Sequence, residues 1–181
     1  LAVLAKFKAV EITLFLQASV NWTVRFLITG EIGGGALEAE YGKRALEVHQ
    51  GKLTTTREIA TAMAGIIPVD DAFKVAFSVA TASKANLARY YLRALQRKAD
   101  NEEEPQYVPN DGGEISLEHI LPQSPSPDWK IDVDTLRANW QRIGNLVLLQ
   151  ASENNLVAND SYSIKKATLA KSKFSLTSYC A

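Results

Sequence analysis

The feature that most constrains this fold is a change in the spacing of apolar residues on either side of residues 100–113. Before this segment, apolar residues recur every three or four positions, as on one face of an α-helix. After it, residues 114–120 alternate and residues 145–149 form a short β-prone run. The segment itself joins an acidic run to two prolines and a glycine pair, which disfavour a packed regular element. The sequence therefore predicts a mostly α, α+β chain: a helical domain over 1–99, a linker over 100–113 and a small second domain over 114–181.

Breakers divide the helical pattern into separate pieces. Gly33-Gly34-Gly35 interrupts it, the threonines at 54–56 precede Arg57-Glu58 as a helix cap would, and Pro68 to Asp71 indicates a stop followed by a new start. In the second domain the pattern predicts strand, helical excursion, strand and helix. The predicted helices are 1–15, 22–28, 36–48, 56–67, 71–81, 84–99, 134–141 and 161–172.

The composition excludes several classes of protein. Of 181 residues, 46% are hydrophobic, which is enough to form a core. The 20 basic and 20 acidic residues cancel, so a nucleic-acid role has to come from a local patch and a metal rather than from net charge. The single cysteine, Cys180, cannot form an internal disulfide, and without a Cys-x-x-Cys pair we expect no structural zinc. This cysteine usage is typical of the reducing cytosol and predicts a cytoplasmic protein.

The apolar start of the chain does not indicate a membrane segment. The longest uncharged run near the start, Ile12 to Val24, is shorter than the ~20 residues that a membrane helix needs.

The chain opens at Leu1 inside an apolar helical pattern, with no initiator methionine. We therefore expect a fragment that lacks an N-terminal partner domain.

Candidate chemistry centres on one of the two histidines. His119 follows Glu118 at the end of a predicted strand, where a carboxylate and an imidazole can form a metal-ligand pair or a ligand beside a general base. The alternative is a histidine that is hydrogen-bonded inside a small sheet. We interpret the other histidine and the tryptophans as packing residues: His49, Trp22, Trp129 and Trp140.

Further candidate residues follow downstream of His119. Gly144-Asn145-Leu-Val-Leu-Leu149 comes after Glu118-His119-Ile-Leu-Pro122, and it is followed by Asn154 and then by a segment that contains Asn159, Tyr162 and Lys165. Taken singly, the asparagines are also consistent with turns or helix starts, and the lysine with a solvated side chain. Together the series resembles the HNH, or ββα-metal, nucleases. It resembles more closely the C-terminal nuclease domain of GmrSD-type modification-dependent restriction enzymes, over residues 114 to about 177.

The resemblance implies a role for each of these residues. It implies that His119 is the general base, that Asn145 orients its imidazole through a hydrogen bond, and that Lys165 lies near the scissile phosphate. It also implies a divalent ion, Mg²⁺ or Mn²⁺, held by Asn154 and by Glu118, which replaces the aspartate common at that position. Asn159 and Tyr162 match the pattern as supporting residues. Adjacent strand residues point to opposite faces, so Glu118 and His119 share a site only if the strand bends or ends there.

Two groups of basic residues are candidates for binding DNA. No acidic residue follows Asp160, whereas four lysines do, and residues 84–98 carry basic residues without an acidic one. Contacts of this kind bind phosphates and read no sequence. For the arginines, a solvated helix face or a contact with the acidic residues 102–104 is the alternative. The candidates are Lys166, Lys171, Lys173, Arg89, Arg93 and Arg97.

The resemblance predicts a metal-dependent DNA endonuclease that serves as the effector of an anti-phage restriction protein. The resemblance also implies that a nucleotide-dependent sensing domain precedes the helical region, which ends near Leu87 to Leu95. A different class of function stays open. The chain can instead be a catalytically silent nucleic-acid-binding or assembly module that keeps the HNH frame.

Overall fold

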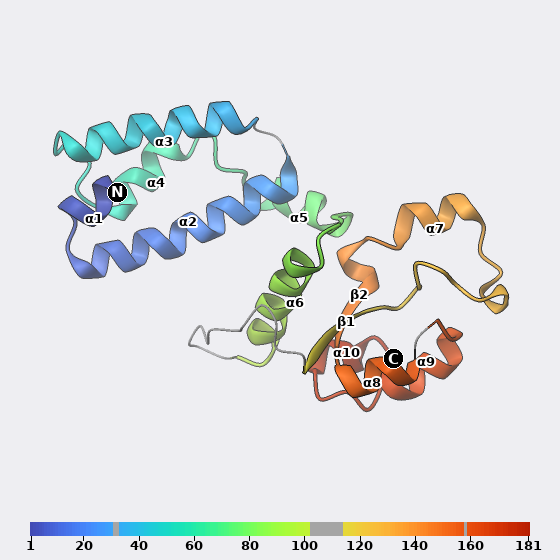
Figure 1. Ribbon diagram of the computed structural model, residues 1–181. Coiled ribbons are helices and arrows are strands. Elements are labelled where there is room, and N and C mark those ends of the chain that lie inside the picture. The colour runs from blue at the N-terminus through green and yellow to red at the C-terminus, as the bar shows by residue number, and fades with distance from the viewer. Residues whose placement is uncertain (31–32, 102–113, 158) are drawn as a thin grey trace. The chain divides into compact units, whose positions relative to one another are not determined.

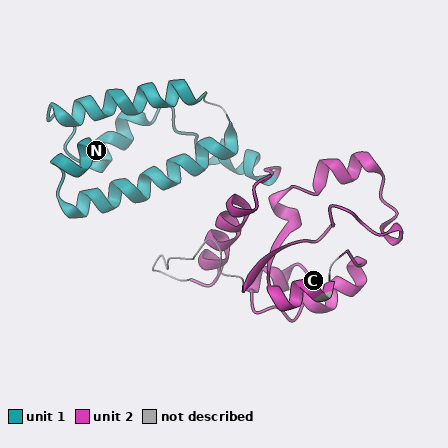
Figure 2. Cartoon of the chain, viewed as in Figure 1, with its two compact units in different colours: residues 1–78 teal, residues 79–181 magenta. Residues whose placement is uncertain are grey.

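The computed structural model describes residues 1–30, 33–101, 114–157 and 159–181. The chain forms two compact units, Leu1–Ser78 and Val79–Ala181 (Figure 2). The first is entirely helical in its described part and the second contains a small sheet, so the predicted class, α+β and mostly α, is confirmed. None of the helices in the described ranges is long and apolar enough to cross a membrane.

The first unit is built from α1 to α5 (Figure 1). The predicted helices 36–48, 56–67 and 71–81 correspond to α3, α4 and α5, although α4 ends at Met63 and α5 at Ser78. Thr55 and Glu58 form a capping box at the start of α4. Residues 1–15 and 22–28 were each predicted as one helix, and most of them are helical, but the divisions differ. Phe7 and Lys8 adopt extended backbone and split the first predicted helix, and α2 runs without a break through the end of the first and all of the second. The observed bounds are α1 Ala2–Lys6, α2 Ala9–Thr29, α3 Gly34–His49, α4 Thr56–Met63 and α5 Asp70–Ser78.

The core of this unit lies between α1, α2, α3 and α4. The ring of Trp22, which packs edge-on against Phe15 at 6.2 Å between centroids, confirms the predicted packing role. His49, by contrast, is exposed at the end of α3, so its predicted packing role is wrong. The buried members of the core are Val3, Trp22, Phe26, Val48, Ile59 and Met63.

The second unit holds a two-stranded antiparallel sheet with helices around it (Figure 1). Both strands were predicted, as were α6, α7 and α9, whereas α8 and α10 were not. The predicted linker lies almost wholly outside the described residues, and the domain boundary stays a prediction. The observed bounds are α6 Ala85–Ala99, β1 Ile115–His119, α7 Val133–Asn139, β2 Leu146–Gln150, α8 Ala151–Val157, α9 Tyr162–Leu169 and α10 Ser175–Tyr179, with short 3₁₀ turns at Pro127–Trp129 and Ile143–Asn145.

Helix α6 packs with this sheet, although the helical spacing of its apolar residues placed it in the predicted N-terminal domain. It contacts both strands and α10. The Gln96 amide nitrogen donates to Asp100 and to Ser175 at the start of α10, at 2.7 Å each. An amphipathic period shows that a helix buries one face, but it does not show what that face packs against.

Packing covers both faces of the sheet. Val147 and Leu149, which pair with Glu118 and Ser116 across the ladder, form a cluster with Val157 of α8 and Leu169 of α9. The other face carries Leu117, His119, Leu146 and Leu148, of which the two β2 residues are buried. As a result β2 reads as a continuous apolar run rather than as an alternating one.

Candidate active site

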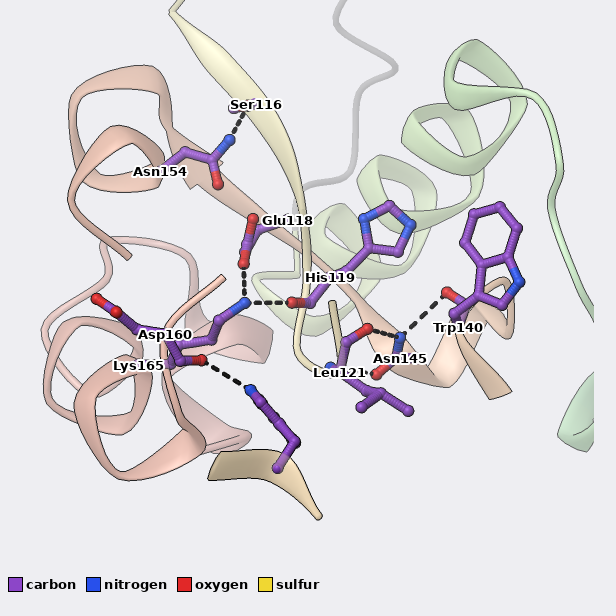
Figure 3. A network of polar contacts seen from close by, with 10 residues as sticks. Ser116, Glu118, His119, Leu121, Trp140, Asn145, Asn154, Asp160 and Lys165 are labelled. Carbon is purple, nitrogen blue, oxygen red and sulfur yellow. Dashed lines mark hydrogen bonds and ion pairs between the residues drawn. The ribbon is translucent and has the colours of Figure 1, made fainter. Parts of the chain in front are cut away.

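Glu118 and His119 are the last two residues of β1, and they lie on opposite faces of the sheet. The ladder continues in register to the end of the strand, with His119 opposite Leu146. No bend therefore turns the two side chains to one side. Figure 3 shows the imidazole on one side of β1 and the Glu118 carboxylate on the other.

The Glu118 face holds a buried ion pair. The Lys165 ammonium, on α9, donates to the Glu118 carboxylate and to the backbone carbonyl of His119, the latter at 2.7 Å. Lys165 is fully buried and Glu118 is 7% exposed. Burial raises the pKa of Glu118, and the hydrogen bond and charge of Lys165 oppose that rise. The pair thus ties α9 to the end of β1.

Asn154 of α8 lies on the same face of β1. Its amide nitrogen donates to the Ser116 hydroxyl at 2.7 Å, and Ser116 and Glu118 are two residues apart on the strand, so their side chains share a face. The Asn154 Oδ1 is buried and has no hydrogen-bond partner in the described part of the chain. A buried carbonyl oxygen without a donor is costly, so this atom is suited to a ligand that the protein alone does not supply.

The His119 imidazole is half-buried on the opposite face. Its ring lies 5.9 Å from that of Trp140 between centroids, with 31° between the planes. Burial lowers the pKa of His119, and the positive charge of Lys165 lowers it further. The imidazole is therefore neutral at neutral pH, which is the state in which it can accept a proton.

Asn145 contacts the backbone around His119 and not its ring. Its Oδ1 accepts from the Leu121 amide at 2.7 Å, and its Nδ2 donates to the carbonyls of Leu121 and Trp140 at 2.9 and 3.1 Å. The Ile120 amide also donates to the Asn145 carbonyl at 2.9 Å. The structure therefore does not have the expected bond from Asn145 to the imidazole. Asn145 fixes the chain that leaves β1.

A comparison of the sequence with models of known families gives a match. The family model described as GmrSD restriction endonucleases, C-terminal domain, matches residues 67–181, more than half of the chain. This chain belongs to that family. The match includes every candidate site residue and supports a restriction endonuclease effector domain with DNA as its substrate. A search of curated proteins finds no match.

Among the described residues, no hydrogen bond joins the remaining candidates of the GmrSD domain to Glu118, His119 or Asn154. Asn159 is exposed, and the Tyr162 hydroxyl donates to the Cys180 carbonyl at 2.8 Å. The three candidate DNA-binding lysines, Lys166, Lys171 and Lys173, are exposed.

The arginines of α6 differ from these lysines in their burial. Arg89, Arg93 and Arg97 are half-buried, and burial together with the charge of Arg89 lowers the pKa of Arg93. The role of these three arginines in binding DNA stays a prediction. Trp129 is half-buried and donates its indole N–H to the Asp160 carbonyl at 3.1 Å, and Trp140 packs on His119.

The oxygen atoms on the Glu118 face of the GmrSD domain fit a divalent cation. Carboxylate and amide oxygens are the ligands that Mg²⁺ and Mn²⁺ accept, and the unpartnered Asn154 Oδ1 is such an oxygen. Among the described residues, no cluster of three or more His, Cys, Asp or Glu side chains can hold a metal, so protein ligands would be few and water would complete the shell. Ser116 was not among the predicted residues. Its place two residues before Glu118 on the strand was a usable signal that the two side chains share a face.

Proposed function

We propose that residues 67–181 are the catalytic part of a divalent-metal-dependent DNA endonuclease of the HNH type, which hydrolyses phosphodiester bonds in a modification-dependent restriction system. The supporting observation is the buried, unpartnered Oδ1 of Asn154 on the strand face that carries Glu118, in a chain whose family consists of restriction endonucleases.

Glu118 and Asn154 are the proposed metal ligands. When bound, a divalent ion stabilises negative charge on the phosphate oxygens. The protein's part is to hold two oxygen ligands on one strand face, and Asn154 is kept in place by its bond to Ser116.

His119 is the proposed general base, and it takes a proton from the attacking water. Its burial keeps the imidazole neutral, and its position as the last residue of β1 puts it where the sheet ends. Because the imidazole and the Glu118 carboxylate flank the strand from opposite faces, we place the phosphodiester across the end of β1. Asn145 is a positioning residue in this scheme, because its contacts fix the backbone that follows His119.

Exposed lysines hold the DNA backbone in this proposal. Lys166, Lys171 and Lys173 follow the last acidic residue of the chain, Asp160, and all three are open to solvent. They would contact phosphates without reading sequence. Lys165 approaches the phosphate only if it leaves Glu118.

Cleavage of supercoiled plasmid in Mg²⁺, Mn²⁺ or EDTA tests the proposal. The wild-type protein should nick or cut in the metals and not in EDTA, and His119→Ala should lower the rate by about 10²- to 10⁴-fold. His49→Ala is the matched control, because it removes the chain's other histidine at an exposed position. Equal activity in His119→Ala and the wild type would contradict the proposed base.

A silent DNA-binding module is the rival, and two observations favour it. Lys165 already neutralises Glu118, and the imidazole lies on the other face of β1. DNA binding with intact plasmid in every metal would support that rival.

A further inference from the structure

We propose that the Lys165 ammonium is the resident cation of this site, and that a divalent ion binds to Glu118 and Asn154 by displacing it. This inference rests on the proposed function and specifies which cation occupies its metal site before the divalent ion binds. It concerns three side chains that the fold brings to one face of β1 from three elements: β1, α8 and α9.

The first observation is where the ammonium lies. Lysine side chains usually reach water, yet Lys165 is fully buried and its Nζ bonds the Glu118 carboxylate and the His119 carbonyl. Its neighbour Lys166 on the same helix is exposed, as lysines usually are. The ammonium therefore provides the positive charge that the buried Glu118 carboxylate requires.

The second observation is what the ammonium leaves unsatisfied. Asn154 Oδ1 is buried without a donor in the described chain, although the amide nitrogen of the same side chain is bonded to Ser116. The lysine thus bonds the Glu118 carboxylate on this face but not the Asn154 Oδ1. A divalent ion ligated by Glu118 and Asn154 together satisfies the oxygen that the ammonium does not.

The two cations compete because they share one buried carboxylate. Figure 3 shows Lys165 below Glu118 and Asn154 on its other side. Two positive centres on a single carboxylate repel each other, and burial leaves that repulsion weakly screened. Binding of the metal therefore weakens the hold of Glu118 on Lys165 and frees the ammonium from the carboxylate.

The first test measures Mn²⁺ affinity by titration calorimetry, without DNA. Lys165→Met removes the competing cation, so its Kd for Mn²⁺ should be at least tenfold lower than that of the wild type. Lys166→Met is the matched control, because it removes the adjacent exposed lysine of the same helix, and its Kd should stay within twofold. Unchanged or weaker Mn²⁺ binding by folded Lys165→Met would overturn the inference.

A second measurement on the wild-type protein guards against misfolding of that variant. In ¹⁵N-lysine NMR, a buried and hydrogen-bonded ammonium gives a distinct signal, which is assigned to Lys165 by its absence in Lys165→Arg. This signal should shift or disappear in proportion to Mg²⁺ occupancy. A signal that stays unchanged in Mg²⁺-saturated protein would show that the lysine is not displaced. Loss of the response in Asn154→Ala is expected, because that variant removes a proposed ligand.

The outcomes separate this inference from the proposed function. Displacement of Lys165 together with uncut plasmid would support the inference and contradict the nuclease. Cleavage with an undisturbed Lys165 signal would do the reverse. A wild-type protein that binds neither Mn²⁺ nor Mg²⁺ would overturn the inference.

Discussion

At the scale of single residues, Asn145 shows how one carboxamide can position the proposed base, His119, without contacting its imidazole. Its three hydrogen bonds hold the amide and carbonyl of Leu121 and the carbonyl of Trp140. These contacts join the chain that leaves β1 to the turn that enters β2. The position of His119 therefore depends on Asn145 through the backbone.

Asn145→Ala should lower the free energy of unfolding by about 2 kcal/mol, because it leaves half-buried backbone groups without partners. Urea unfolding measures this change. Asn139→Ala is the control, because Asn139 donates to one carbonyl on an exposed helix surface, and its cost should be under about 0.5 kcal/mol. Equal costs for the two variants would show that the Asn145 contacts are not structural.

Removing one partner of the Glu118–Lys165 pair should be costly in the metal-free protein. Lys165→Met leaves a buried carboxylate without a counter-charge, and we expect a loss of about 3–5 kcal/mol of folding stability. The double variant Glu118→Gln with Lys165→Met should recover part of that loss, because no unpaired charge remains. Denaturant titration in EDTA compares the three proteins, and a double variant as unstable as Lys165→Met would contradict the expected coupling.

Motif spacing could identify the candidate site residues, but it could not predict their orientation. Four lysines follow Asp160, and nothing in their order distinguishes the buried one. A usable signal for the burial of Lys165 was its place on α9, one helical turn before the apolar Leu169, which is also fully buried. Which face of the helix meets β1 is decided by tertiary packing, so the ion pair was not predictable from spacing alone.

At the scale of elements, α10 is fastened to α6 by a polar cluster. Gln96 bonds Asp100 and Ser175, and the Ser175 hydroxyl donates to Asp100 at 2.7 Å. The hydrogen bonds from Gln96, and then those from Ser175, lower the pKa of Asp100 from its usual 3.8. The cluster therefore connects the last helix of the chain to a helix nearly 80 residues earlier.

Asp100→Asn should destabilise the protein at neutral pH but not in acid. A carboxyl whose pKa is lower in the folded state contributes stability above its unfolded pKa, and this contribution is lost as the pH falls through its folded pKa. The difference in unfolding free energy between wild type and variant should thus shrink as the pH falls from 7 to 3. The exposed Asp134 of α7 supplies a control, Asp134→Asn, and a difference that does not vary with pH would contradict the assigned role of Asp100.

Elements with a clear period were predictable, and short ones bounded by tertiary contacts were not. The β-prone run at 145–149 corresponds to β2, and the alternation at 114–120 to β1. Helix α8 begins directly after β2, and its first turn is held by Glu153, which accepts from the Gln150 amide at 3.0 Å. Seven residues are too few for a hydrophobic period to be recognised.

At the scale of the whole molecule, each unit has a core made of its own residues. The larger cluster contains Ile59 and Trp22 from the first unit, and the sheet cluster contains Leu149 from the second. The three tryptophans are divided between the units, with Trp22 in the first and Trp129 and Trp140 in the second. Tryptophan fluorescence can therefore report on each unit separately.

Ile59→Ala should weaken the first unit by about 2–4 kcal/mol, because it opens a cavity at a residue that is 1% exposed. The denaturation midpoint should fall when Trp22 is the only fluorophore and should change little when Trp129 and Trp140 are the fluorophores. Leu149→Ala should give the opposite pattern. Equal shifts at both probes in both variants would show that the chain unfolds as one cooperative body.

The segment between β1 and β2 leaves the sheet and returns to it where hydrogen bonds join its two ends. Leu121 and Asn145 hold its ends together, and Lys130 lies on an exposed turn far along it. Lengthening such a closed loop costs only ~0.6 kcal/mol for each doubling. A reporter peptide grafted at that turn should therefore leave the strand register intact, which makes this turn a suitable insertion point.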